Sequence, residues 1–85
     1  MNTLTEEEVR EMLDPFGFVD SVEFSPGAVI VKQWNKEEVI KADCVISIDY
    51  MSHEETTYSI SEYTEGSSRN TGYKKVVGHI ASRLT

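Results

Sequence analysis

The sequence predicts an α+β fold in which two amphipathic helices pack on one face of an antiparallel sheet of three to four strands. An apolar stripe with helical spacing lies near each end of the chain, and the residues between the stripes alternate as strands do. The expected order of elements is therefore α-β-β-β-β-α. Short connections between consecutive strands favour antiparallel neighbours, which is the simplest arrangement for such a chain.

Length and composition are typical of a single globular domain, residues 1–85. Hydrophobic residues make up 39% of the chain and charged residues 27%, which is not the composition of a disordered segment. Apolar runs stay well below the 18 residues or so that suggest a membrane span, and the acidic N-terminus differs from a signal peptide. These features predict a cytoplasmic protein.

The first helix is predicted to begin after Thr5. Thr5 and Glu8 have the spacing of a capping box, in which each side chain satisfies the free backbone N–H of the other residue. Pro15 disfavours helical geometry in the residue before it, so the helix should end near Leu13. Four residues follow the spacing of one buried helix face: Val9, Met12, Leu13 and Phe16.

A β-hairpin is predicted next, with its turn at Pro26 and Gly27. These residue types suit the two central positions of a turn, because proline fixes φ and glycine can take a positive φ. Val22 and Phe24 share one face of the strand before the turn. Residues 28–34 are apolar on both faces, which is typical of a central strand.

Two further strands are predicted over residues 42–51 and 56–64. In the first of them, alternation places Cys44, Ile46 and Ile48 on one face, which we expect to point into the core. The opposite face of the sheet should be exposed and acidic, with Glu23, Gln33, Asp43, Ser47, Asp49, Ser59 and Ser61.

The segment between the second and third predicted strands is interpreted as a loop. Residues 35–38 are polar and could form at most one helical turn. Residues 65–72 form another polar loop. The last helix follows it, capped by Asn70 or Thr71. Its apolar stripe is unbroken: Tyr73, Val76, Val77, Ile80, Ala81 and Leu84.

No catalytic site, metal site or cofactor site is predicted, and we do not expect an enzyme. His53, His79 and Cys44 lack the spacing of a zinc site, and no nucleotide-binding or hydrolase motif occurs. A single cysteine among apolar strand neighbours usually behaves as a small hydrophobic residue, so Cys44 should be an inert core thiol. Carboxylates are abundant, but catalysis by a pair of them also needs a cleft.

The charge of the chain is unevenly distributed. All 15 acidic residues and only four basic residues lie in residues 1–65, which gives that part a charge of −11. Residues 66–85 carry four basic residues and no acid, which brings the total to −7. A charge of this sign argues against general binding of nucleic acid and favours a basic partner.

One interpretation of the acidic part is that its carboxylates take the place of nucleic-acid phosphates in a basic groove. In size and composition the chain resembles the small acidic inhibitors that phages and mobile elements encode against restriction and CRISPR systems. The other interpretation is that the charge only keeps the protein soluble. The candidate partner-binding residues are Glu23, Asp43, Asp49, Glu54, Glu55, Glu62, Glu65 and Trp34.

The C-terminal part offers an alternative, basic site. Its residues are Arg69, Lys74, Lys75, His79 and Arg83. The arrangement of residues 66–68, the paired lysines and Ala81 resembles the end of double-stranded-RNA-binding domains, in which lysines at a helix start contact phosphates. The resemblance covers about 20 residues and implies RNA binding. It departs from the family at residues 76–80, which stand where that family has an alanine-rich helix.

The expected function is that of a small acidic, non-enzymatic interaction protein. The leading hypothesis is an inhibitor or nucleic-acid mimic of the anti-restriction or anti-CRISPR type, acting in the cytoplasm of a host cell if a phage encodes it. Its partner would be a larger protein or nucleoprotein complex with a basic surface. Direct nucleic-acid binding and membrane binding are not expected, and the protein would be a monomer or homodimer. The alternatives are an RNA-binding module and a minor subunit of a larger assembly.

Overall fold

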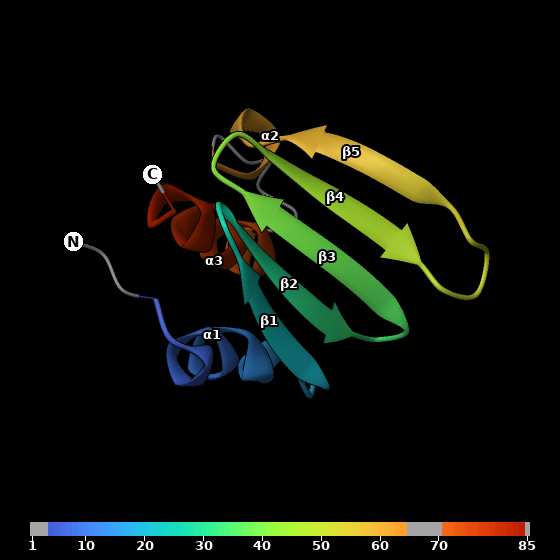
Figure 1. The fold of residues 1–85 in the computed structure, drawn as a ribbon, viewed down its shortest axis with the longest axis horizontal. Helices are drawn as coiled ribbons and strands as arrows, with labels where there is room; N and C mark the ends of the chain where they lie inside the picture. Colours follow the sequence, from blue (N-terminus) through green and yellow to red (C-terminus); the bar gives the residue numbers. More distant parts are fainter. Residues whose placement is uncertain (1–3, 65–70, 85) are drawn as a thin grey trace.

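The computed structural model describes residues 4–64 and 71–84 and confirms the α+β class (Figure 1). Its antiparallel sheet has five strands in the order β1-β2-β3-β4-β5, so each strand pairs with the next one in the chain. The described residues form three helices, of which α1 and α3 contribute side chains to the same core. The predicted numbers, three to four strands and two helices, were therefore too low.

Helix α1, Glu6–Leu13, has the predicted N-terminus. The Glu8 amide donates a hydrogen bond to Thr5 Oγ1 at 3.2 Å, and the Thr5 amide donates to Glu8 Oε1 at 3.3 Å. Pro15 lies in a 3₁₀ turn, η1 (Asp14–Phe16), that follows the helix directly. The predicted end near Leu13 is thus confirmed.

The first hairpin also agrees with its sequence signal. Strands β1 (Ser21–Ser25) and β2 (Ala28–Gln33) pair so that the residues on either side of the Pro-Gly turn face each other. Gly27 has a φ of 74°, a left-handed conformation that costs glycine little and other residues more.

The segment predicted as a loop is a strand, β3 (Lys36–Lys41). It pairs with β2 through the two-residue turn Trp34-Asn35, whose residues have φ values of 59° and 58°. Two successive positive φ values match the right-handed twist of a hairpin, and they usually occur at Asn-Gly or Asp-Gly. The sequence lacks that signal here, which is why the turn was missed.

The second half of the sheet is shorter than predicted. Strands β4 (Cys44–Asp49) and β5 (Glu55–Ser59) form a hairpin, and a short helix, α2 (Ser61–Thr64), replaces the end of the predicted fourth strand. The Ser59 amide donates a hydrogen bond to Glu62 Oε2 at 3.0 Å, which turns the chain out of the sheet. Helix α3, Thr71–Ser82, begins within the range of the predicted loop, and the proposed cap Asn70 lies outside the described residues.

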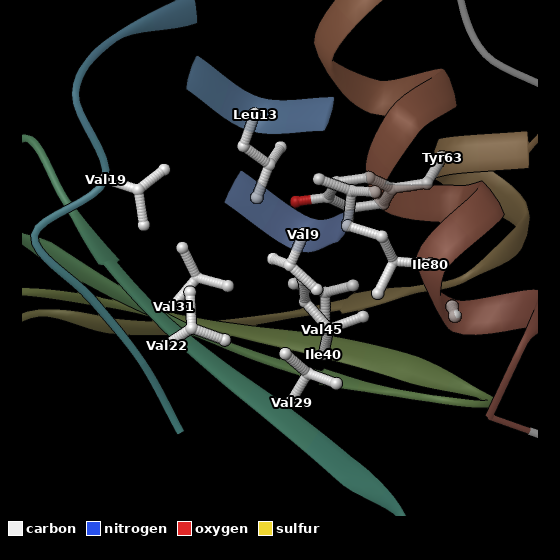
Figure 2. Packing of buried hydrophobic residues seen from close by; sticks show 12 residues of the cluster. Val9, Leu13, Val19, Val22, Val29, Val31, Ile40, Val45, Tyr63 and Ile80 are labelled. Carbon is white, nitrogen blue, oxygen red and sulfur yellow. The ribbon is translucent and has the colours of Figure 1, made fainter. Parts of the chain in front are cut away.

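The core lies between the helices and one face of the sheet, which we call the covered face (Figure 2). Side chains from α1 and α3 meet small branched side chains of the four strands β1 to β4, and the ring of Tyr63 enters from α2. The buried hydrophobic residues are Val9, Leu13, Val19, Val22, Ala28, Val29, Val31, Ile40, Val45, Tyr63, Val77, Ile80 and Ala81.

The face of β4 that points into the core is opposite to the predicted one. Val45 lies between Ile40 and Tyr58 on the covered face and is fully buried, so alternation turns the neighbouring residues outward. Cys44, Ile46 and Ile48 are half-buried on the other face, which we call the open face. Cys44 is therefore not the core thiol that was expected.

The same alternation corrects the face that was predicted to be exposed. Gln33 lies on the covered face and is only 4% exposed. Its amide Nε2 donates to the Gly17 carbonyl at 2.6 Å and to the Leu13 carbonyl at 3.4 Å, which ties β2 to the end of α1.

Within residues 4–64 and 71–84, no helix has the length and hydropathy to cross a membrane.

Candidate functional site

Two connections of the sheet meet at one end, which we call the loop end. It comprises the turn 34–35 between β2 and β3 and the connection 50–54 between β4 and β5. The Tyr50 amide donates a hydrogen bond to the Asn35 carbonyl at 2.9 Å and joins the two connections. Figure 1 shows the hairpin of β4 and β5 projecting beyond the helices at this end.

The loop end exposes large hydrophobic side chains. Trp34 is 67% exposed, Tyr50 42% and Met51 78%. Phe18 is also exposed and follows Gly17, which Trp34 contacts. Tryptophan, tyrosine and methionine are enriched at protein interfaces, so this end of the sheet is a candidate binding surface. Trp34 lies on the side of its covered face, and Tyr50 lies on the side of its open face.

Trp34 is held in place although its ring is exposed. Its indole Nε1 donates a hydrogen bond to the Phe16 carbonyl at 3.2 Å, and the ring lies against Gly17, where any side chain would collide with it. A bulky residue with positive φ is a genuine outlier that costs about 1–2 kcal/mol. Conformations of this kind cluster at functional sites, where the surrounding structure holds them.

The connection 50–54 is also organised by its own side chains. Asp49 Oδ1 accepts hydrogen bonds from the amides of Met51 at 2.8 Å and Ser52 at 3.3 Å, and His53 takes a positive φ of 62°. The Tyr50 hydroxyl donates to Glu37 Oε1 at 2.6 Å, and this bond raises the pKa of Tyr50 to about 12. The exposed side chains therefore stand on an ordered loop.

The structure distributes the predicted acidic site over several places. Glu54 and Glu55 are exposed at the loop end, where the connection 50–54 leads into β5, whereas Glu23 lies on the open face of β1. Asp49 is engaged by the loop amides, and Glu62 by the Ser59 amide. Two acidic residues of the predicted site remain. Asp43 lies at the opposite end of the sheet, and Glu65 lies outside the described residues.

The basic site is divided as well. Arg83 Nη1 donates to Glu8 Oε2 at 2.7 Å, which links α3 to α1 and holds the pKa of Glu8 below its usual range. Lys74 turns toward the ring of Tyr63, while Lys75 and His79 are exposed. Arg69 lies outside the described residues.

A second candidate site, which the sequence did not suggest, is a cleft of about 540 Å³ on the covered face. It lies where strands β3, β4 and β5 meet η1, α2 and the start of α3, and we call it the aromatic cleft. Its lining residues are Phe16, Trp34, Lys36, Glu38, Ser47, Tyr58, Tyr63, Tyr73 and Lys74.

Four rings of the aromatic cleft contact one another in two pairs. Phe16 and Tyr73 meet edge to face with centroids 5.6 Å apart, and Tyr58 and Tyr63 do so at 5.9 Å. The ammonium of Lys74 lies 5.5 Å from the centroid of the Tyr63 ring. Edge-to-face pairs are the favoured geometry of aromatic side chains, so the walls of the cleft are preformed.

Glu38 is the carboxylate of the aromatic cleft. It lies on the covered face between Val31 and Ser47 in the strand register. Burial raises the pKa of Glu38 to about 7, and the nearby charge of Lys36 offsets only part of this effect. If residues 36–41 had been recognised as a strand, alternation would have placed Lys36, Glu38 and Ile40 on one face.

Searches of protein-family models, curated proteins and solved structures found no match to this chain. Among the described residues, no group of three or more His, Cys, Asp or Glu side chains is placed to hold a metal ion. The loop end and the aromatic cleft are therefore interpreted from their own geometry.

Proposed function

We propose that this protein is a non-enzymatic interaction domain that docks its loop end onto a basic surface of a larger protein or nucleoprotein complex. The observation that carries the proposal is the gathering of Trp34, Tyr50 and Met51, all exposed, at one end of the sheet. A few aromatic residues usually supply most of the binding energy of an interface.

The order of the loop end supports this proposal. Trp34 is fixed by Gly17 and by the Phe16 carbonyl, and Tyr50 is fixed through Glu37 and Asn35. Side chains that are already ordered lose less conformational entropy on binding. The positive φ values of the two connections are a cost of folding that such a binding surface would explain.

The negative charge of the loop end suggests that the proposed partner has a basic surface. Glu54 and Glu55 are exposed beside the hydrophobic side chains, in a chain with 15 acidic and eight basic residues. Their field would attract a basic surface and accelerate the encounter. We further propose that the partner handles nucleic acid and that the domain inhibits it, because a phosphate-binding surface is basic and carboxylates can occupy it.

The first test is a pull-down from host extract with charge-reversed variants. Glu54→Lys/Glu55→Lys should lose the captured partner, whereas Glu7→Lys/Glu11→Lys makes the same change in net charge on an exposed face of α1 and should retain it. Capture by the unmodified protein should weaken between about 0.05 and 0.5 M salt, because salt screens exposed charges. Equal losses in both variants would indicate that only net charge matters and would contradict the proposal.

The second test addresses the hydrophobic side chains once a partner has been captured. Met51→Ala should lower the affinity about tenfold, as expected for a residue at the centre of an interface. Phe24→Ala is the control, because Phe24 is also exposed but lies at the end of β1 that is remote from the loop end.

Micromolar binding of double-stranded RNA by the unmodified protein at about 0.15 M salt would favour the RNA-binding alternative instead, since a chain of this charge should repel a polyanion.

A further inference from the structure

The aromatic cleft carries a local charge that is opposite to that of the whole protein. Two lysines, Lys36 and Lys74, line it together with a single carboxylate, Glu38. The formal net charge of the chain is −7, so this excess of positive charge is a local reversal. A concave site with an excess of charge of one sign concentrates ions of the opposite sign.

The walls of the cleft suit a flat ring. Five of its nine lining residues are aromatic, and the two edge-to-face pairs hold four of these rings at fixed angles. Trp34 stands at the same site with its indole fixed by the Phe16 carbonyl. Aromatic faces attract planar rings through dispersion and through favourable alignment of their quadrupoles.

The position of Lys74 argues against a cationic ligand. An aromatic cage for an ammonium group needs a free ring face, with which the bound cation interacts. In this cleft the ammonium of Lys74 already lies over the ring of Tyr63, at 5.5 Å from its centroid. A second cation would be repelled by Lys74 and Lys36, whereas an anion would be attracted by both.

We propose that the aromatic cleft binds a small planar aromatic ring that carries an anionic group. The ring packs among the aromatic side chains, and the anionic group is bound by Lys74 and Lys36. Ser47 and Glu38 provide polar groups for the edge of the ring. The cleft shares Trp34 with the loop end, but the docking tests use Met51, Glu54 and Glu55, which do not line the cleft, so either proposal can fail without the other.

The size of the cleft supports a small molecule. A volume of about 540 Å³ falls within the range of about 300–1,000 Å³ that is usual for small-molecule sites. Two kinds of compound share the proposed chemistry: nucleoside monophosphates, which carry the anion on a sugar, and aromatic carboxylates, which carry it on a short chain.

Trp34 provides a direct readout, because it is the single tryptophan of the chain and lines the cleft. The experiment titrates the protein with adenosine 5′-monophosphate, uridine 5′-monophosphate, 4-hydroxyphenylacetate and indole-3-acetate. Tryptophan fluorescence monitors the first three, and backbone amide chemical shifts of Glu38 and Ser47 monitor all four. The neutral counterpart adenosine and the amine tyramine complete the panel and separate the contribution of the anion from that of the ring.

At least one anion of the panel should bind about tenfold or more tightly than its uncharged or cationic counterpart, the gain expected from charge-assisted hydrogen bonds. Whether the nucleotides or the carboxylates bind identifies the kind of compound. Saturation of neither kind at millimolar concentration, or equal binding of tyramine and 4-hydroxyphenylacetate, would overturn the proposal.

Three variants should change the affinity for the anion in different directions, whereas a loss of structure would lower the affinity in all of them. Lys74→Gln should weaken binding about tenfold, and its neighbour Lys75→Gln, which does not line the cleft, should leave it within about twofold. Glu38→Gln removes the carboxylate and should strengthen binding of the anion. Equal losses in Lys74→Gln and Lys75→Gln would overturn the proposed site. If Lys74→Gln fails to fold, Lys36→Gln with Lys41→Gln as its control asks the same question on β3.

Discussion

The core and the loop end are built from the same sheet in opposite ways. In the core, valines and isoleucines of regular strands are buried under α1 and α3. At the loop end, the tight turn 34–35 and the connection 50–54 carry every non-glycine positive φ of the described residues and expose Trp34, Tyr50 and Met51. The regular part supplies stability, and that stability allows the loop end to keep an exposed and strained surface.

The largest effect that would test this comparison comes from two isoleucines on neighbouring strands. Ile40 is 1% exposed on the covered face, and Ile46 is half-buried on the open face. Ile40→Ala should lower the free energy of unfolding by about 2–5 kcal/mol, because it leaves a cavity under the helices. Ile46→Ala should cost less than about 1.5 kcal/mol, since water can fill the space.

Urea denaturation of both variants measures the difference directly. Similar costs for Ile40→Ala and Ile46→Ala would mean that the open face is covered in solution, for instance by a second copy of the chain. The comparison between a buried and an open face would then no longer hold for the protein in solution.

A smaller effect is expected at the boundary between the two regions, where Glu38 lines the aromatic cleft. Its pKa is about 7 in the folded state and 4.5 without burial, so the folded protein binds the proton more tightly than the unfolded chain. Stability is therefore favoured while Glu38 is protonated and falls as the pH rises from about 4.5 to about 7. The loss should reach about 3 kcal/mol at most.

Glu38→Gln should remove this loss and make stability nearly independent of pH between about 5 and 8. The control is Glu55→Gln, which changes an exposed carboxylate on β5 and should keep the slope of the unmodified protein. Denaturation curves at four pH values measure both variants. An unchanged slope in Glu38→Gln would show that another group titrates on folding.

The smallest effect concerns the support of Trp34 at the loop end. Gly17 has a φ of 147°, and a Cβ atom there would collide with the indole of Trp34. Gly17→Ala should cost about 1–3 kcal/mol and shift the fluorescence of Trp34 as the ring moves. Gly27→Ala is the matched control, because its φ is also positive but the space around it is open. Its cost should be similar or smaller, with no change in fluorescence.

The elements predicted correctly are those with a local signal. The capping box of Thr5 and Glu8, the stop at Pro15 and the Pro26-Gly27 turn each depend on a few adjacent residues. Strand β3 was missed because the turn before it begins with Trp34, and because Lys36, Glu37 and Glu38 are polar on both faces of the strand and show no alternation.

Features that depend on distant parts of the chain could not be predicted in this way. The more apolar face of β4, with Cys44, Ile46 and Ile48, turns outward, and only the packing of the helices decides that Val45 points inward. The aromatic cleft combines residues of η1, three strands, two helices and the turn at Trp34. Their approach follows from the folded arrangement and leaves no periodic pattern in the sequence.

The strand order has a consequence for how fast the protein folds. Each strand pairs with its neighbour in the chain, so four hairpins with short connections build the whole sheet. Such local contacts lower the entropy cost of reaching the transition state, and we expect rapid folding for a protein rich in strands. The contact of α1 with α3, closed by Glu8 and Arg83, spans nearly the whole chain and should form last. Weakening it should therefore accelerate unfolding while leaving the rate of folding almost unchanged.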